Sequence, residues 1–241
     1  MYKNKSIIAI IPARKNSKGL YKKNILKIKN KELFLWPLSN IKKSKYVDKI
    51  VVSTDDISIY KKSIKNGAHQ FRLRPKNISG DKSKTSSAIL HALNYFKKDK
   101  NKNFDYIICL EPTSPFTDTK FIDKSIKKLI SNPVAHSLVS VYSNAYANPN
   151  SLFITNKKKN FLVLPKYKNL ENFHTRRQDL KKYYFLDGSL YLSKVSSFFR
   201  FKSFLTKRTM WTLTKKKIQA MEIDDKDDYN FLKLIIENGY K

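Results

Sequence analysis

The sequence predicts an α/β fold in which a mostly parallel, Rossmann-like sheet is covered by helices on both faces. Three observations lead to it: short apolar runs recur along the chain, helical segments separate them, and polar loops follow them. Apolar runs of this length are typical of strands buried on both faces, and their alternation with helices is typical of a parallel sheet. The 241 residues fit a single domain with its own core.

The first predicted strand is the Ile-rich run SIIAIIP, which is followed by a polar, Gly-containing loop. Gly67 is placed to end a helix, and the two prolines of EPTSPF forbid strand or helix there, so this segment is a loop. The expected order is a strand at 6–12, a loop at 13–24, a helix at 34–43, a strand at 48–56, a helix at 57–66, a short strand at 69–75, a helix at 85–97, a strand at 104–110, a loop at 111–116 and a helix at 118–130.

The pattern changes between residues 134 and 182. Short β-like pieces, SLVSVYS and SLFITN, alternate there with Asn-Pro and Lys-rich turns, so this range is predicted to be a small β-rich insertion. The chain then returns to the core with YYFLDGSLYLS and MWTLTKKKIQAMEI and closes on a helix near 229–236. Residues 1–241 are thus expected to form one domain that carries the insertion.

The formal net charge of +31 raises the possibility of a nucleic-acid-binding protein. However, 43 of the 50 basic residues are Lys, and they are scattered along the whole chain instead of gathering on one predicted element. This distribution argues against a dedicated nucleic-acid face. The single Cys109 lies in an apolar run, and no run reaches the roughly 20 residues that span a bilayer, so a cytoplasmic protein is expected.

The first polar loop, IPARKNSKGLYKKN, places several cations after a buried strand. Ligands of parallel α/β sheets bind beyond the carboxyl ends of the strands, where loop amides and cations can hold phosphates. The loop is not a Walker A sequence, and on its residues alone a solvated basic surface is the alternative.

Five ordered segments carry a closer likeness. IPAR with NSKGL and KN, then RLRP with Asp81 and Thr85, then LEPTSPF, then RRQDL with FLDGSLY, and finally EIDDKDD together resemble the motifs of the acylneuraminate cytidylyltransferase family. These segments span residues 7–228, nearly the whole chain. The resemblance implies an enzyme that couples CTP to a nonulosonic, sialic-type acid and releases pyrophosphate, with Mg²⁺ as the cofactor.

The resemblance also implies roles for individual residues. The residues implied to hold the nucleotide are Arg14, Lys18, Lys23, Asn24, Arg74 and Thr85. Of these, Arg14 and Lys23 are the leading phosphate ligands and, with Asp224, the candidate catalytic residues. The reaction needs cations around the phosphates and a positioned nucleophile more than covalent catalysis. For Arg14 and Lys18, the alternative is a solvated surface cation.

On the sugar side, the motif positions imply that Glu111, Arg177 and Gln178 bind the substrate. A guanidinium can grip a carboxylate through two parallel hydrogen bonds, as an acidic nine-carbon sugar requires, although a surface ion pair is the alternative for Arg177. The chain departs from the family at Glu111, where Gln is usual, and at Asp187, where Asn is usual. Phe185 stands where some members have a further Arg.

Glu222 and Asp224 alternate about Ile223 in an extended apolar segment, so their side chains are expected on one face. Two neighbouring carboxylates suit a magnesium ion that also contacts substrate phosphates, and the pair matches the family's metal site. The acids that follow, Asp225, Asp227 and Asp228, are expected to form the acidic start of the last helix.

Two further expectations concern partners. The resemblance implies a homodimer formed through the insertion, and symmetric dimers are the commonest oligomers. Two alternatives to the leading function remain: a related nucleotidyltransferase that uses another nucleotide or a sugar phosphate, and a basic nucleic-acid-binding protein.

Overall fold

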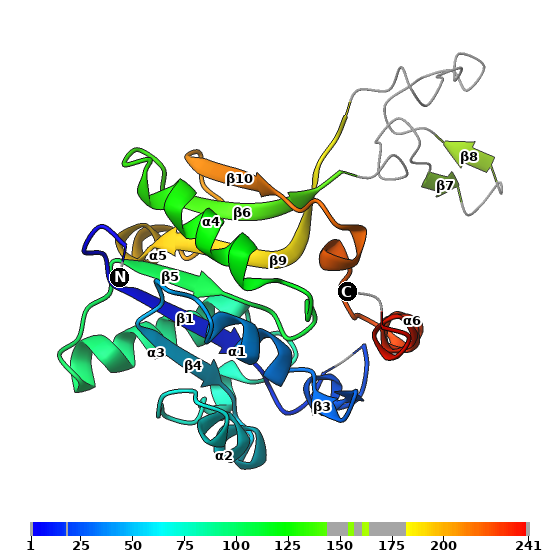
Figure 1. Ribbon diagram of the computed structural model, residues 1–241, viewed down its shortest axis with the longest axis horizontal. Helices are drawn as coiled ribbons and strands as arrows, with labels where there is room; N and C mark the ends of the chain where they lie inside the picture. The colour runs from blue at the N-terminus through cyan, green and yellow to red at the C-terminus, as the bar shows by residue number, and fades with distance from the viewer. Residues whose placement is uncertain (1, 18, 144–153, 157–160, 164–181, 240–241) are drawn as a thin grey trace.

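The chain folds around one twisted sheet in the order β10-β6-β9-β5-β1-β4 (Figure 1). The computed structural model describes residues 2–17, 19–143, 154–156, 161–163 and 182–239. The strands of this sheet are β1 (Ile7–Pro12), β4 (Lys49–Ser53), β5 (Tyr106–Cys109), β6 (Ser137–Tyr142), β9 (Phe185–Lys194) and β10 (Thr209–Leu213). A mostly parallel sheet was predicted, and it is confirmed.

The pairing is parallel except at β9. β1 pairs in parallel with β4 and with β5, so that Ile10 lies opposite Val51 on one side and Cys109 on the other. β9 runs antiparallel to both β5 and β6, and β10 is parallel to β6. The start of β9 therefore lies at the edge where its neighbours β5 and β6 end.

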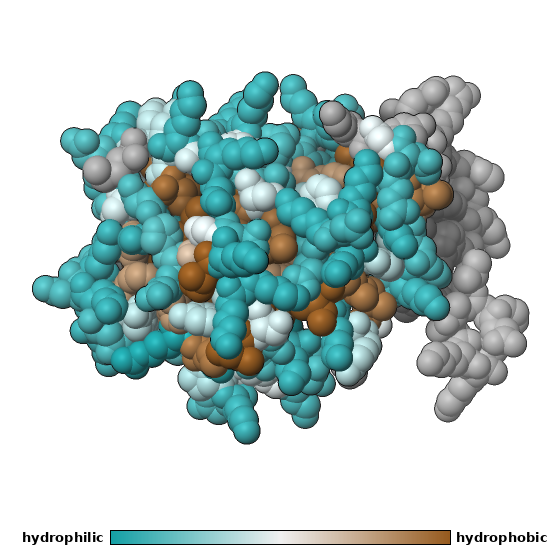
Figure 2. Space-filling model, turned by 60° about the horizontal axis from the view of Figure 1, so that its bottom comes forward, coloured by the Kyte–Doolittle hydropathy of each residue, from teal (hydrophilic) through white to brown (hydrophobic). Residues whose placement is uncertain are grey.

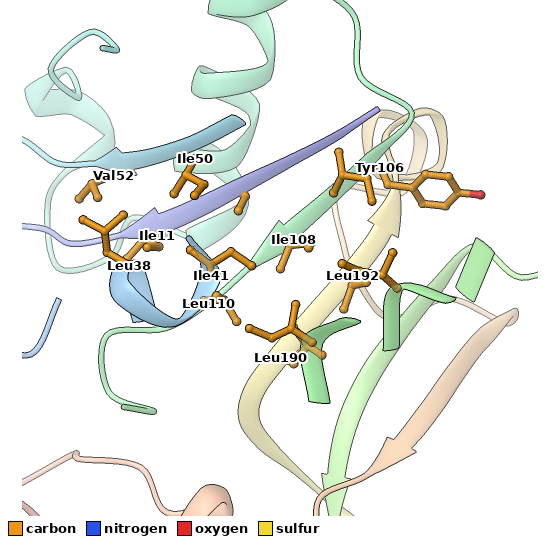
Figure 3. Close-up of a cluster of buried hydrophobic side chains, with 14 of the residues drawn as sticks. Ile11, Leu38, Ile41, Ile50, Val52, Tyr106, Ile108, Leu110, Leu190 and Leu192 are labelled. Atoms are coloured by element: carbon orange, nitrogen blue, oxygen red, sulfur yellow. The ribbon is translucent and has the colours of Figure 1, made fainter. Parts of the chain in front are cut away.

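Helices cover both faces of the sheet, as predicted. On one face, α1 (Leu35–Ile41), α2 (Ile57–Lys65) and α4 (Thr119–Ile130) bury apolar residues against the strands. In Figure 3, Leu38 of α1 lies beside Ile11, and Ile41 lies beside Leu110. On the other face, α3 (Thr85–Asp99) and α5 (Val195–Phe201) pack onto Ile8, Ile10 and Val51. The apolar runs are buried on both sides, which explains why they lack alternation.

A smaller cluster builds the C-terminal part of the fold. β2 (Lys27–Ile28) and β3 (Lys31–Glu32) form a short hairpin. Ile28 of β2 and Leu33, which follows β3, pack against Ile223 and against α6 (Lys226–Glu237). Short 3-10 helices lie at Lys23–Ile25, Lys76–Ile78 and Lys217–Ala220. By burying Ile223, this cluster fixes the position of the two acids on either side of it.

The strand predicted at residues 69–75 does not form. The segment forms two backbone hydrogen bonds, one to β4 and one to the residue that follows it: His69 N donates to Ile50 O at 2.7 Å, and Arg74 N donates to Thr54 O at 2.7 Å. Between these two hydrogen bonds, the predicted strand advances five residues, whereas the segment it faces advances four. A regular β-ladder needs the same number of residues on both sides, so no strand forms here and the prediction was wrong.

The start predicted for the insertion, residue 134, is too early. Its first β-like piece is β6, a central strand that contacts β9 and β10. The prediction failed there because a change in sequence pattern does not reveal which strand a segment will pair with. Later in the range, β7 (Ile154–Asn156) pairs antiparallel with β8 (Phe161–Val163), while residues 144–153, 157–160 and 164–181 lie outside the described part of the chain.

Across the described residues, no helix combines the length and apolar character needed to span a membrane. The visible face in Figure 2 is covered by hydrophilic side chains that are dispersed among apolar ones and do not gather in one band. This dispersal agrees with the scattered Lys residues of the sequence.

Candidate active site

A cleft of about 450 Å³ opens at the edge of the sheet where the parallel strands end. It brings together five of the residues predicted to hold a nucleotide: Arg14, Lys23, Asn24, Arg74 and Thr85. The three acidic candidates, Glu111, Glu222 and Asp224, line the same cleft. Lys18, Arg177 and Gln178 lie outside the described residues.

The loop after β1 supplies the first cations. Asn24 is buried and donates from Nδ2 to the backbone oxygen of Arg14 at 2.8 Å, which closes the loop on itself. Arg14 donates from Nη1 to the backbone oxygen of Gly80 at 3.0 Å and pairs with Asp81 at 2.9 Å. The Arg14 guanidinium is therefore held at the cleft by backbone and carboxylate partners that an anionic ligand can replace.

Lys23 connects this loop to the C-terminal acids. Its Nζ donates to the backbone oxygen of Ile223 at 2.7 Å and to Oδ1 of Asp224 at 3.2 Å. Gly19 lies against the same segment, since a Cβ at residue 19 would be 2.7 Å from the backbone oxygen of Asp224. Only glycine permits this approach without a shift, so the loop and the acid segment form one unit.

Arg74 lies at the back of the cleft with a relative exposure of 7%. Its Nε donates to Oγ of Ser53 at 3.2 Å, and its Nη2 donates to the backbone oxygen of the same residue. Burial lowers the pKa of the guanidinium, while the nearby carboxylates of Asp55 and Glu111 oppose that shift. An arginine keeps its charge even so, and Arg74 is a fixed cation.

Glu111 follows β5 and occupies the boundary between the cleft and a second pocket of about 310 Å³. Burial, reinforced by the negative charge of Glu222, raises the pKa of the Glu111 carboxyl from 4.5 to about 7. The Cys109 thiol lies 3.7 Å from Oε1 of Glu111, and burial raises the pKa of this thiol well above its usual range. Near neutral pH, therefore, Glu111 can exist with or without its proton.

Glu222 and Asp224 lie in an extended segment that is not part of any sheet. The backbone N–H of Ile223 donates to the backbone oxygen of Thr113 at 3.0 Å, and its side chain is fully buried. With Ile223 turned into the core, both flanking acids line the cleft, as the alternation predicted. Burial raises the pKa of Glu222, and Asp224 and Asp187 raise it further.

The other C-terminal acids have a structural role, as predicted. Asp225 is the N-cap of α6, where its side chain accepts from the Asp228 backbone N–H at 2.9 Å. Asp228 completes the capping box by accepting from the Asp225 backbone N–H at 3.2 Å. Asp227 is exposed in the first turn.

The carboxylates of Glu222 and Asp224 suit a magnesium ion whose other ligands include the phosphates of a bound nucleotide. Among the described residues, no group of three or more His, Cys, Asp or Glu side chains is arranged to hold a metal by itself. Two carboxylates in a cleft lined by cations meet the usual requirement of Mg²⁺, which takes one or two protein carboxylates and completes its shell with phosphates and water. Burial is the main cause of the raised pKa of Glu222, and the negative charges of Asp224 and Asp187 add to it; a bound cation would oppose all three effects.

Sequence reasoning missed two cleft residues. Lys84 is the N-cap of α3 and lines the cleft beside Thr85, so the cation lies at the positive end of a helix dipole. Tyr191 of β9 lines both the cleft and the second pocket. The sequence could have indicated that Lys84 lies at the site, because it stands next to a predicted helix start. Tyr191 gave no such signal, because in the sequence it looks like an ordinary core residue of an apolar strand.

The fold and the site define a class. Cations gathered beyond the carboxyl ends of a parallel sheet, with acids suited to a magnesium ion, are the features of an enzyme that acts on a nucleoside triphosphate. Residues 8–236 match the sequence profile of the family described as Cytidylyltransferase. The chain therefore belongs to this cytidylyltransferase family, and the predicted family and nucleotidyltransferase activity are confirmed.

The sequence similarity to known relatives extends over nearly the whole chain. The chain is 25% identical over 234 residues to a pseudaminic acid cytidylyltransferase of Campylobacter jejuni, covering 97% of both proteins. It is 28% identical over 230 residues to an N-acylneuraminate cytidylyltransferase of Escherichia coli, covering 92% of this chain and 50% of that protein. A solved structure of a CMP:2-keto-3-deoxy-manno-octonic acid synthetase complexed with CTP superposes with a TM-score of 0.67 over 97% of this chain and 99% of the other. At 14% identity, that likeness shows the fold.

Proposed function

We propose that this enzyme transfers CMP from CTP to a nonulosonic acid and releases pyrophosphate. The observation that carries the proposal is the family match over residues 8–236, whose named relatives act on pseudaminic and N-acylneuraminic acids. The cleft supports it, because it places cations and carboxylates where a triphosphate and a metal can bind together.

In the proposed reaction, the anomeric hydroxyl oxygen of the sugar acid forms a bond to the α-phosphorus of CTP. The bond from that phosphorus to the bridging oxygen breaks, pyrophosphate leaves, and the hydroxyl proton passes to the surroundings. Arg14, Lys23 and Lys84 would neutralise the phosphate oxygens, while Arg74, fixed on Ser53, would orient the nucleotide. Positioning and charge neutralisation are the main protein contributions to such reactions.

Glu222 and Asp224 would hold the magnesium ion. When bound, the ion supplies positive charge to the phosphate oxygens and lowers the cost of charge developing on the leaving pyrophosphate. Lys23 already contacts Asp224, so a cation at the acids would free its ammonium group for a phosphate.

The sugar acid would extend from the cleft towards the second pocket past Glu111 and Tyr191. Its carboxylate needs a planar cation, and Arg177, beside Gln178, remains the proposed partner. The homodimer, the magnesium dependence and the cytoplasmic location expected from the sequence are also part of this proposal. We add to it a role in the biosynthesis of surface polysaccharides. For the dimer, a monomeric mass in sedimentation at micromolar concentration would contradict the expectation.

The decisive experiment is a substrate panel. Purified enzyme is incubated with Mg²⁺, each of CTP, GTP, UTP and ATP, and a set of nonulosonic acids or a sugar phosphate, and pyrophosphate release is measured. We expect turnover only with CTP and a nonulosonic acid, with the CMP-sugar identified by mass spectrometry. Turnover with another nucleotide, or only with a sugar phosphate, would refute the proposed specificity. The Lys23→Met variant, which lacks a proposed phosphate ligand, serves as the inactive control.

A further inference from the structure

Asp187 is a buried acid with one carboxyl oxygen unpaired within the described part of the chain. It lies near the start of β9 with a relative exposure of 1%. Its Oδ1 accepts from the Ser189 backbone N–H at 3.0 Å and from the Ser140 hydroxyl. Its Oδ2 is buried and has no hydrogen-bond partner among the residues that the structure describes. A buried carboxylate oxygen left unpaired costs free energy, so its retention needs an explanation.

The next residue, Gly188, lies directly against Glu222. A Cβ at residue 188 would be 1.2 Å from Oε1 of Glu222, and the residue has a φ of +65°, which glycine tolerates best. The Glu222 carboxyl therefore rests on the Gly188 backbone, one residue from Asp187. Two carboxylates separated by a single glycine, one of them buried, repel each other, because the protein interior screens charge less than water does.

We propose that the Asp187–Gly188 turn is a positioning device for Glu222: Gly188 seats the Glu222 carboxyl, and the buried charge of Asp187 strengthens the attraction of that carboxyl for a divalent cation. This inference rests on the proposed function, because it assumes that Glu222 serves a metal–nucleotide complex. Asp187 does not line the cleft, so it acts through Glu222 and is not a ligand itself.

The physical reason is the balance of charge in the ligand-free enzyme. Asp187 and Glu222 carry like charges on either side of Gly188 and repel each other, which destabilises the empty site. A divalent cation removes that repulsion, so the free energy gained on cation binding includes the relief of it. Removing the charge at residue 187 should then have two opposite effects: greater stability without ligand and weaker cation binding.

Asp187→Asn tests this with little change in shape. CTP binding is measured by calorimetry under two conditions, one with Mg²⁺ and one with a chelator in its place. No sugar acid is added, so no turnover occurs. The ratio of the two dissociation constants gives the coupling between magnesium and nucleotide. We expect Asp187→Asn to reduce this ratio on the order of tenfold, from the loss of one unit charge near a divalent ion. Asp227→Asn, an exposed acid in the same region with the same charge change, should leave it unchanged.

Thermal unfolding without ligand provides the second readout. If Asp187 acts by its charge, Asp187→Asn raises the melting temperature; if it is only a structural hydrogen-bond acceptor, the substitution lowers it or prevents folding. Gly188→Ala tests the seat separately, because its methyl group must displace the Glu222 carboxyl, and it should also reduce the coupling.

The outcomes separate the two ideas. A folded Asp187→Asn protein with unchanged coupling, a lowered melting temperature, or a folded Gly188→Ala protein with unchanged coupling would each overturn the inference while leaving the proposed function intact. A wild-type enzyme that binds no CTP under either condition would instead contradict the proposed function.

Discussion

Replacing Glu111 by Gln should stabilise the ligand-free enzyme at high pH and not at low pH. Glu111 has a pKa of about 7 in the folded protein and an ordinary value of 4.5. The folded state therefore holds the proton more tightly than the unfolded state does. Stability contributed by this carboxyl is fully present below pH 4.5 and is lost as pH rises through about 7. Glutamine has the same shape and no charge to bury.

The size of the effect follows from the two pKa values. They set an upper limit of roughly 3 kcal/mol on the stabilisation of the Gln variant at pH 8. Glu111 faces an open cleft, so screening by solvent reduces the expected value to about 1–2 kcal/mol. For a chain of this length, that corresponds to a rise in melting temperature of about 3–6 °C.

The assay is thermal or urea unfolding of both proteins at pH 5 and pH 8, with a chelator and without nucleotide. Glu237→Gln is the matched control, because it removes the same charge from an exposed residue at the end of α6. We expect the stabilisation by Glu111→Gln to grow by more than about 1 kcal/mol between the two pH values, and that by Glu237→Gln to stay nearly constant. An equal effect of Glu111→Gln at both pH values would refute the burial argument.

Three other substitutions give distinct signatures. Asp224→Asn should reduce kcat on the order of a thousandfold if the acid holds magnesium, whereas the exposed Asp227→Asn should change kcat little; steady-state rates across a magnesium titration check this. Arg177→Lys should raise the KM of the sugar acid and leave that of CTP nearly unchanged, and equal effects on both would show that Arg177 is misassigned. Asp225→Ala should lower the unfolding free energy by about 1 kcal/mol through loss of the α6 cap, as urea denaturation would show.

Much of the fold was predictable because its signals are local. β1, β4 and β5 are continuous apolar runs, and a strand buried on both faces needs little else to be recognised. The helix starts at Asp56 and Asp118 carry capping side chains. The failures came where partners are distant: residues 69–75 have strand-like composition, but their unequal step along β4 prevents a ladder.

The candidate site, too, contains some residues that the sequence could predict and others that it could not. Arg14, Lys23 and Asn24 lie in one short loop after a recognisable strand, so their convergence followed from topology and from the family motifs. The role of Gly188 could not be predicted, because it depends on Glu222, 34 residues further along the chain. Tyr191 was hidden for a related reason, since only the folded sheet shows that it borders two pockets.

The acids at and behind the cleft come from three parts of the chain, and the one antiparallel strand of the six-stranded sheet explains how they meet. β5 ends at the cleft edge and delivers Glu111, while β9, running the opposite way, begins at that edge and places Asp187 behind the cleft lining. The packing of Ile223 then brings Glu222 against the β9 start. A fold that gathers like charges in this way is less stable when empty than it could be. Substitutions that neutralise Glu111 or Asp187 should therefore stabilise the empty enzyme and, for Asp187, weaken its response to magnesium. A change such as Asp225→Ala, which touches only a helix cap, should lower stability and leave the magnesium response unchanged.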